Sequence, residues 1–370
     1  MLYIGIDQHS KQITVCVRNQ EGDAILRRQV STRPEKIAAF FEQIIKLDPE
    51  FMALLECCGF NDWLLEELRK YNCREIVLIH PEKLSKKKTD QRDARMLADL
   101  LWLNRERLAA GQTVHGLRRV YIATQQEQED RQLTALRKNL AQRLTRATNK
   151  IQRILHRHNL MWQYPTKIFR TKTGMAWLEN VKLPEMDRFE VDILLQEWKS
   201  LEEQLTKVNA KIVERASRSD PKCPLNPTQI LMTAPGVSHY SGLGLASRIG
   251  PIERFPRPRS LANYFGLTPG SRNSGETVRP GSITKEGSKF ARFLLGQLVL
   301  HFLKQDPKMR DWYRRIKLRR GSKIARVAVM RRITTIFWHM LKYQERYTIG
   351  GPPPRLQKSR SRQNTQHQAA

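Results

Sequence analysis

The sequence predicts an α/β domain at the N-terminus, a long helical coiled-coil region in the middle and a mainly α-helical C-terminal domain. Three observations predict this organisation. Strand and helix patterns alternate over roughly the first hundred residues, two apolar stripes with heptad-like spacing follow, and positive charge accumulates towards the C-terminus. A chain of 370 residues is long enough for two or three domains. We expect them at 1–115, 116–216 and 225–345, followed by a disordered basic tail at 350–370.

The N-terminal domain opens with strand patterns at 2–7, 12–18 and 25–31, and the connections are short enough for an antiparallel meander. Helix and strand patterns then alternate, with helices expected at 34–47 and 61–71 and strands at 51–55 and 74–80. Three antiparallel strands followed by alternating helices and strands is the order of an RNase H-like α/β fold.

An acidic helix start follows the last of these strands. Thr89 suits an N-cap, because its hydroxyl can accept a backbone N–H. Asp90 and Asp93 come next, and residues three apart share one face of a helix. An acidic first turn is also common in helices without a function, because carboxylates are favoured at the positive end of the helix dipole.

Two further acids change the interpretation of this pair. Asp7 ends the first strand and Glu56 ends a later one. RNase H-like folds place carboxylates at these strand ends and on a helix beside the sheet, where Asp90 and Asp93 fall. Four carboxylates can hold two Mg²⁺ ions about 3.5–4 Å apart and clamp the reacting oxygens of a phosphodiester. Mg²⁺ prefers such oxygen ligands.

The neighbouring histidine and cysteines carry less information. His9 lies close to Asp7 in sequence, and a role as a metal ligand stays open. The five cysteines are an odd and scattered set without a Cys-x-x-Cys pair, which argues against a disulfide framework and a zinc ribbon. No apolar run reaches the ~18 residues of a membrane span, and no signal peptide is evident, so we expect a cytoplasmic protein.

The charge is unevenly distributed. Residues 1–100 hold 16 Lys+Arg and 16 Asp+Glu, residues 101–250 hold 24 and 14, and residues 251–370 hold 26 and 6. All of the net charge of +30 therefore lies after residue 100. A basic field of this size is typical of nucleic-acid binding. An anionic membrane surface is less suited, because neither a basic helix with a strong apolar face nor a lipidation signal stands out.

Two long helices are predicted in the middle of the chain, at 122–160 and 191–215. Their apolar residues recur at intervals of three and four, as in Leu133, Leu136, Leu140 and Leu144 of the first. The pattern indicates an antiparallel helical hairpin or a dimerising coiled coil, or simply the core of a helix bundle.

The C-terminal part contains a short turn and a polar loop. Pro235, Gly236 and Val237 form a tight turn between two helical patterns, as in a helix-hairpin-helix unit that holds a phosphate through backbone N–H groups. The polar loop runs from Gly270 to Gly281. A hydroxyl flanked by Arg and Lys suits a nucleophile for a phosphodiester, although a serine in such a loop is more often a turn residue.

The motifs together resemble a known family. They are Tyr-Ile-Gly-Ile-Asp (3–7), Leu-Glu-Cys-Cys-Gly (55–59), Lys-Thr-Asp-x-x-Asp-Ala-Arg-x-Leu-Ala (88–98), Ala-Pro-Gly-Val (234–237), Phe-Gly-Leu-Thr-Pro (265–269) and Lys-x-Gly-Ser (285–288). The chain resembles, over about residues 2–345, the DEDD-type transposases of insertion-sequence family number one hundred and ten. The pilin-gene invertases are relatives of that family.

The resemblance implies a RuvC-like N-terminal domain, a helical coiled-coil region and a C-terminal transposase domain. It places the acidic tetrad on Asp7, Glu56, Asp90 and Asp93. It also implies a serine nucleophile, by position Ser274, with Ser271 as the competitor. Members bind a structured non-coding RNA, the bridge RNA, that pairs with donor and target DNA, and they work as dimers that meet as tetramers. Where the family pattern has a second glycine after Pro-Gly-Val this chain has Ser238, which weakens a phosphate site at that turn.

The sequence thus predicts a DNA recombinase of a bacterial or archaeal mobile element that acts at the nucleoid. As the resemblance implies, Ser274 attacks a phosphate that is activated by two Mg²⁺ ions bound to the four acids. Candidate nucleic-acid contacts are Arg272, Arg279, Lys285, Lys289 and Arg292. Two alternatives stay open: a Mg²⁺-dependent Holliday-junction resolvase without a serine step, and a structured-RNA-binding protein without catalysis.

Overall fold

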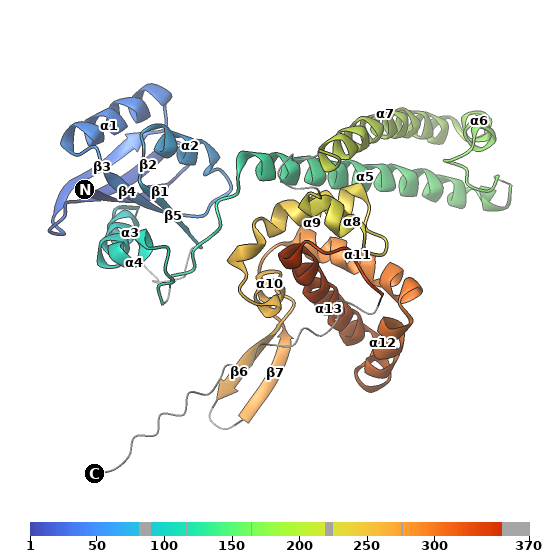
Figure 1. The fold of residues 1–370 in the computed structure, drawn as a ribbon. Coiled ribbons are helices and arrows are strands. Elements are labelled where there is room, and N and C mark those ends of the chain that lie inside the picture. The colour runs from blue at the N-terminus through green and yellow to red at the C-terminus, as the bar shows by residue number, and fades with distance from the viewer. Residues whose placement is uncertain (81–89, 116, 164, 219–224, 275–276, 350–370) are drawn as a thin grey trace, which may run out of the picture. The chain divides into compact units, whose positions relative to one another are not determined.

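The computed structural model describes residues 1–80, 90–115, 117–163, 165–218, 225–274 and 277–349, and only the backbone of 90–91, 271–274 and 277–280. The chain divides into two compact units, Met1–Ile122 and Ala123–Ala370, each of which has its own core (Figure 1). Within the described residues, no helix combines the length and the hydropathy that crossing a membrane requires.

A five-stranded mixed sheet forms the centre of the first unit. In chain order its strands are β1 (Leu2–Gln8), β2 (Gln12–Arg18), β3 (Ala24–Ser31), β4 (Phe51–Glu56) and β5 (Glu75–Ile79). Across the sheet the order is β3-β2-β1-β4-β5. The first three strands are antiparallel, and β4 and β5 run parallel to β1. This mixed α/β sheet, with its helices, fits the RNase H-like fold that the sequence predicted.

Successive side chains of a strand point to opposite faces of the sheet. In this sheet both faces carry buried apolar residues, and helices cover both. Ile4 and Ile6 pack on one face against α1 (Pro34–Leu47) and α2 (Asp62–Lys70). Tyr3 packs on the other face with Met52, Leu54 and the helix α3 (Asp90–Leu103). The short helix α4 (Arg105–Ala109) adds Leu108 to the same cluster. Thr89, the expected N-cap of α3, lies outside the described residues.

An antiparallel helical hairpin begins the second unit (Figure 1). Its arms are α5 (Gln125–Arg157) and α7 (Glu185–Ala216), and the connection holds η1 (Leu160–Trp162) and α6 (Lys172–Asn180). Near the connection Ile154 packs with Val191 and Leu194, and farther back Leu140 packs with Leu201. The hairpin that the apolar spacing predicted is confirmed, whereas a coiled coil in the middle of the chain stays a prediction.

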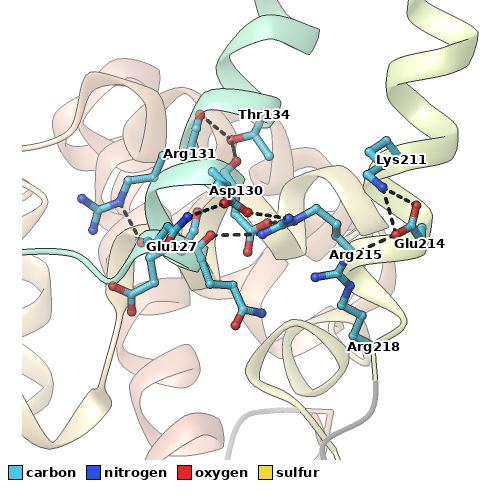
Figure 2. A network of polar contacts seen from close by, with 12 residues as sticks. Glu127, Asp130, Arg131, Thr134, Lys211, Glu214, Arg215 and Arg218 are labelled. Atoms are coloured by element: carbon cyan, nitrogen blue, oxygen red, sulfur yellow. Dashed lines mark hydrogen bonds and ion pairs between the residues drawn. The ribbon is translucent and has the colours of Figure 1, made fainter. Parts of the chain in front are cut away.

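A buried ion pair joins the open end of the hairpin (Figure 2). The guanidinium of Arg215 on α7 donates to Asp130 on α5, and both side chains are at most 10% exposed. Arg215 also donates to Glu129 over 2.8 Å. The next residue, Arg131, donates to the carbonyl of Ser247 on α9 over 2.8 Å. Burial raises the pKa of Asp130, and the contact with Arg215 lowers it only in part. These bonds tie α5, α7 and α9 into one body.

Further helices and one small sheet complete the second unit. They are α8 (Pro227–Met232), α9 (His239–Ile249), η2 (Ile252–Arg254), α10 (Pro258–Tyr264), β6 (Pro269–Ser274), β7 (Thr277–Ile283), α11 (Lys289–Gln305), α12 (Pro307–Arg320) and α13 (Ser322–Tyr343). Phe302 of α11 and Phe337 of α13 lie at the centre of their core. The prediction of a loop at 270–281 was wrong, because residues on both sides of its tip pair as the antiparallel hairpin β6–β7.

Candidate active site

Two of the predicted acids lie at the carboxyl ends of neighbouring parallel strands, on the same face of the sheet. Ile6 of β1 pairs with Leu55 of β4, so Asp7 and Glu56 follow at the same level. Residues two apart on a strand share a face. Asp7 therefore lies on the α3 face with Tyr3, and Glu56 lies there with Leu54.

The helix α3 packs against β1 with almost no space between the backbones. A Cβ atom on Gly5 would lie 2.2 Å from the amide nitrogen of Ala98 and 2.3 Å from the carbonyl oxygen of Ala94. Farther along α3, Asp99 forms an ion pair with Arg18, at the opposite end of the strands from Asp7. The helix thus runs antiparallel to β1, and its first turn lies at the Asp7 end.

This first turn carries the other two predicted acids. The helix begins at Asp90, and Asp93 is half-buried. Asp7, Glu56 and Asp93 therefore lie at one end of one face, while only the backbone of Asp90 is described. Among the side chains that the structure describes, no three His, Cys, Asp or Glu are close enough to form a metal site.

The immediate neighbours of Asp7 include an unpaired hydroxyl. Thr14 lies directly across from Asp7 on β2, and directly paired residues share a face of the sheet. Thr14 is 2% exposed, and its Oγ1 has no hydrogen-bond partner in the described part of the chain. The Nε2 atom of His9 lies 3.1 Å from Oδ2 of Asp7. Carboxylates with a nearby hydroxyl form an oxygen-rich donor set, which fits Mg²⁺ and its water ligands.

A buried amide pair fixes the two strand ends relative to each other. The side chain of Asn61 donates to Oε1 of Gln8 over 2.8 Å and to the carbonyl of Glu56 over 3.1 Å. Gln8 in turn donates to the carbonyl of Phe60 over 2.9 Å. Gln8 and Asn61 are 8% and 4% exposed. The residue after Asp7 is thus bonded to the segment that follows Glu56.

Thr14, Gln8 and Asn61 were not predicted from the sequence as parts of this site. No motif spacing marks them, because each reaches the site through a partner on another strand or loop. Gly5 could have been found, since an isolated glycine inside a strand often marks a close backbone approach.

The predicted serines lie in the second unit. Ser274 is the last residue of β6 and pairs with Thr277, whereas Ser271 pairs with Pro280. Arg272 pairs with Arg279 across the same small sheet. For these residues the structure describes the backbone alone.

The three other predicted cations lie at the base of this hairpin. Lys285 is exposed and has a φ of 56°. Lys289 is exposed at the first position of α11. Arg292 donates to the carbonyl oxygens of Phe265 and Glu286 over 3.0 and 2.8 Å. Burial lowers the pKa of Arg292. This arginine therefore stabilises the backbone below the hairpin, whereas both lysines face solvent.

The Pro235–Val237 turn has a largely structural environment. Gly236 has a φ of 72°, and a Cβ on it would lie 2.3 Å from the ring of His301. Ser238 caps α9 by accepting a hydrogen bond from the backbone N–H of Ser241. Gly236 thus packs against His301 and Ser238 caps α9, so both residues have a structural role at this turn.

A mixed sheet with acids at the ends of β1 and β4, followed by a helix-rich region, fits the class of RNase H-like DEDD transposases. Residues 4–160 match a family model described as a transposase of the DEDD type of IS110, and residues 228–314 match one described as transposase of the IS116/IS110/IS902 family. The chain belongs to the IS110 family of transposases.

Full-length relatives agree with this assignment. The transposase for insertion sequence element IS1111A of Coxiella burnetii is 25% identical, over 94% of this chain and 91% of the relative. A probable family 20 transposase of Pseudomonas aeruginosa is 24% identical, over 94% of this chain and 98% of the relative. The family implies DNA binding and DNA transposition.

Proposed function

We propose that this transposase is a site-specific DNA recombinase of its mobile element, guided by a structured bridge RNA. Its substrates are double-stranded donor and target DNA. The proposal places Mg²⁺ on Asp7, Glu56, Asp90 and Asp93 and the nucleophile on Ser274. The observation that carries it is the arrangement of the acids. Asp7 and Glu56 lie at the carboxyl ends of adjacent parallel strands, on the face that receives the first turn of α3.

The chemistry is a pair of transesterifications. Bound Mg²⁺ would neutralise charge on the scissile phosphate. The Oγ of Ser274 attacks phosphorus, the bond to the DNA 3′-oxygen breaks, and the serine proton passes to the leaving 3′-hydroxyl. The 3′-hydroxyl of another strand then attacks the phosphoserine and releases the serine. One phosphodiester is exchanged for another, so the reaction needs no ATP.

Other parts of the chain hold the nucleic acids in this proposal. Arg272, Arg279, Lys285 and Lys289 contact phosphates, whereas Arg292 acts through the backbone that it stabilises. The proposed domains are 1–115, 116–216 and 225–345, of which the last two lie almost entirely within one compact unit. The working form is a dimer that assembles into a tetramer. Serine and acids from different subunits can then share one site.

A strand-transfer assay tests the proposal. The full-length protein is incubated with supercoiled DNA that carries the element's flank, with the element RNA and with Mg²⁺, and adducts are trapped on a denaturing gel. We expect wild type to form a protein–DNA adduct, and Asp7→Ala, Asp93→Ala and Ser274→Ala each to lower its yield at least a hundredfold. Removing a group that acts in the chemical step typically lowers the reaction rate by about a hundredfold or more.

Ser271→Ala is the matched control, because it removes the other hydroxyl on the same strand. It should leave adduct formation unchanged, and the opposite result would move the nucleophile to Ser271. Cleavage without an adduct that survives Ser274→Ala would replace the proposal by a Mg²⁺-dependent resolvase. Tight RNA binding by all variants without any cleavage would leave a non-catalytic RNA-binding protein.

A further inference from the structure

A cavity of about 810 Å³ lies between α12, α13 and the base of the β6–β7 hairpin. Its volume is in the range of small-ligand sites, about 300–1,000 Å³. Its wall is mostly apolar, and the apolar side chains that line it are Leu267, Pro269, Ile283, Trp312, Ile324, Val327 and Ala328. Ile324 is 55% exposed, so part of this wall faces solvent. None of the predicted site residues lines the cavity.

The charge around the cavity selects an anionic occupant. Four cations line it: Arg320, Lys323, Arg331 and Arg332. The described residues that line it include no Asp or Glu. The stretch 307–335, which forms both helices here, contains eleven Lys and Arg and the single acid Asp311. A hydrophobic protein segment would bury the same wall but would leave these cations unpaired.

One of the cations is positioned for stacking. The guanidinium carbon of Arg332 lies 5.0 Å from the ring centre of Trp312, which is within the range of a cation–π contact. Unpaired bases stack on aromatic rings and on guanidinium planes. Arg332 on Trp312 therefore offers a base a platform inside a basic rim.

The cavity also adjoins the strand that carries the predicted nucleophile. Pro269 pairs with Ile283 at the base of the hairpin, and both residues line the cavity. Ser274 follows five residues later on β6, about 17 Å away at the ~3.3 Å rise of an extended strand.

We propose that this cavity binds one unpaired nucleotide of a nucleic-acid strand. The base stacks on Arg332, and the flanking phosphates contact Arg320, Lys323 and Arg331. The inference rests on the proposed function, because strand exchange must unpair nucleotides close to the cleaved bond. A nucleotide held at the hairpin base would lie beside the strand that leads to Ser274.

Binding of short oligonucleotides to the full-length protein tests the inference. The probes are a fluorescein-labelled 12-mer single strand, as DNA and as RNA, and the 12-base-pair duplex of the same sequence. Arg332→Lys keeps the charge but removes the planar group. We expect this variant to bind single strands about tenfold more weakly, since a stacked base contributes substantially to affinity, and to bind the duplex like wild type. Arg326→Lys is the matched control, because Arg326 is exposed on the same helix and does not line the cavity, and it should bind both probes like wild type.

A second variant fills the space. Ala328→Phe should weaken single-strand binding about tenfold without changing duplex binding, with an unchanged melting temperature as the check on folding. Unchanged single-strand binding by both variants, or equal losses on both probes, would overturn the inference. If Ala328→Phe altered self-association instead, the cavity would be a protein contact and the inference would also be wrong.

The DNA and RNA probes distinguish the source of the nucleotide. Strand transfer is measured separately on the same proteins. If wild type transfers strands and the variants bind single strands as tightly as wild type does, only the cavity site is refuted. If the variants lose affinity for single strands but not for the duplex, and wild type forms no protein–DNA adduct, only the serine chemistry is refuted.

Discussion

Gln8 and Asn61 hold the strand ends from which Asp7 and Glu56 extend. Gln8→Leu keeps the approximate volume but removes the three hydrogen bonds of this side chain, with Phe60, Asn61 and Cys58. We expect strand transfer to fall 10- to 100-fold, as is typical when the partners of metal-binding residues are lost. We also expect the free energy of unfolding to fall by about 1–3 kcal/mol, because Asn61 loses a buried partner. The measurements are adduct yield and urea unfolding.

Gln20→Leu is the control, because it makes the same change at an exposed position of the same unit. It should alter neither quantity. Wild-type adduct yield in a folded Gln8→Leu protein would show that the amide pair stabilises the fold without positioning the acids.

At the scale of single residues, the sequence predicts site residues whose role follows from a local pattern. Asp7 and Glu56 were predicted because strand ends can be located from apolar runs, and Asp90 and Asp93 because i,i+3 spacing defines a helix face. Gln8 and Asn61 lie 53 positions apart, and only the pairing of β1 with β4 brings them together. Arg292, which the sequence predicted as a nucleic-acid contact, is half-buried and donates to backbone carbonyls beside the turn at Gly266 and Gly287.

At the scale of elements, the contact between α3 and β1 depends on the missing side chain of Gly5. Gly5→Ala would place a Cβ only 2.2 Å from backbone of α3, and backbone cannot rotate away as a side chain can. We expect the helix to shift, at a cost of about 1–3 kcal/mol in the free energy of unfolding. Strand transfer should fall at least tenfold, because the first turn of α3 moves relative to Asp7. Urea unfolding and adduct yield measure the two effects.

Gly59→Ala serves as the control for stability, because a Cβ there would meet nothing within 4 Å. It should leave the urea midpoint unchanged. A Gly5→Ala protein as stable and active as wild type would contradict the close packing of α3 on the strand.

Elements with a strong period were predicted well, and the others were not. The helix at 34–47 and the strand at 12–18 have the predicted bounds, and the long helices α5 and α7 lie where the apolar stripes placed them. The hairpin β6–β7 was missed because Gly, Ser, Pro and Arg dominate its strands and imitate a loop. The break between α12 and α13 at Gly321 has a φ of 81°, a conformation that favours glycine, and was not predicted either.

At the scale of the whole molecule, the net positive charge is separated along the chain from the four predicted catalytic acids. Residues 1–100 are neutral overall, and the net charge of +30 lies beyond them. Phosphate contacts release counterions, so affinity for nucleic acid should fall with salt in proportion to the number of phosphates contacted. We therefore expect Asp7→Ala to abolish strand transfer while its affinity for duplex DNA equals that of wild type. The carboxylates would then act in chemistry, and the basic part would supply binding.

A matched pair of substitutions locates the binding charge. Lys317 on α12 and Lys36 on α1 are both exposed, and each is replaced by Gln. Lys317→Gln should lower the slope of log affinity against log salt by about one, since each phosphate contact contributes about that much. Lys36→Gln should leave the slope unchanged. The measurement is fluorescence anisotropy of a labelled duplex between 50 and 200 mM salt, over which several phosphate contacts cost about a thousandfold or more in affinity. Equal effects of both substitutions would mean that nucleic acid also contacts the neutral unit, and that the separation of charge along the chain does not separate binding from catalysis.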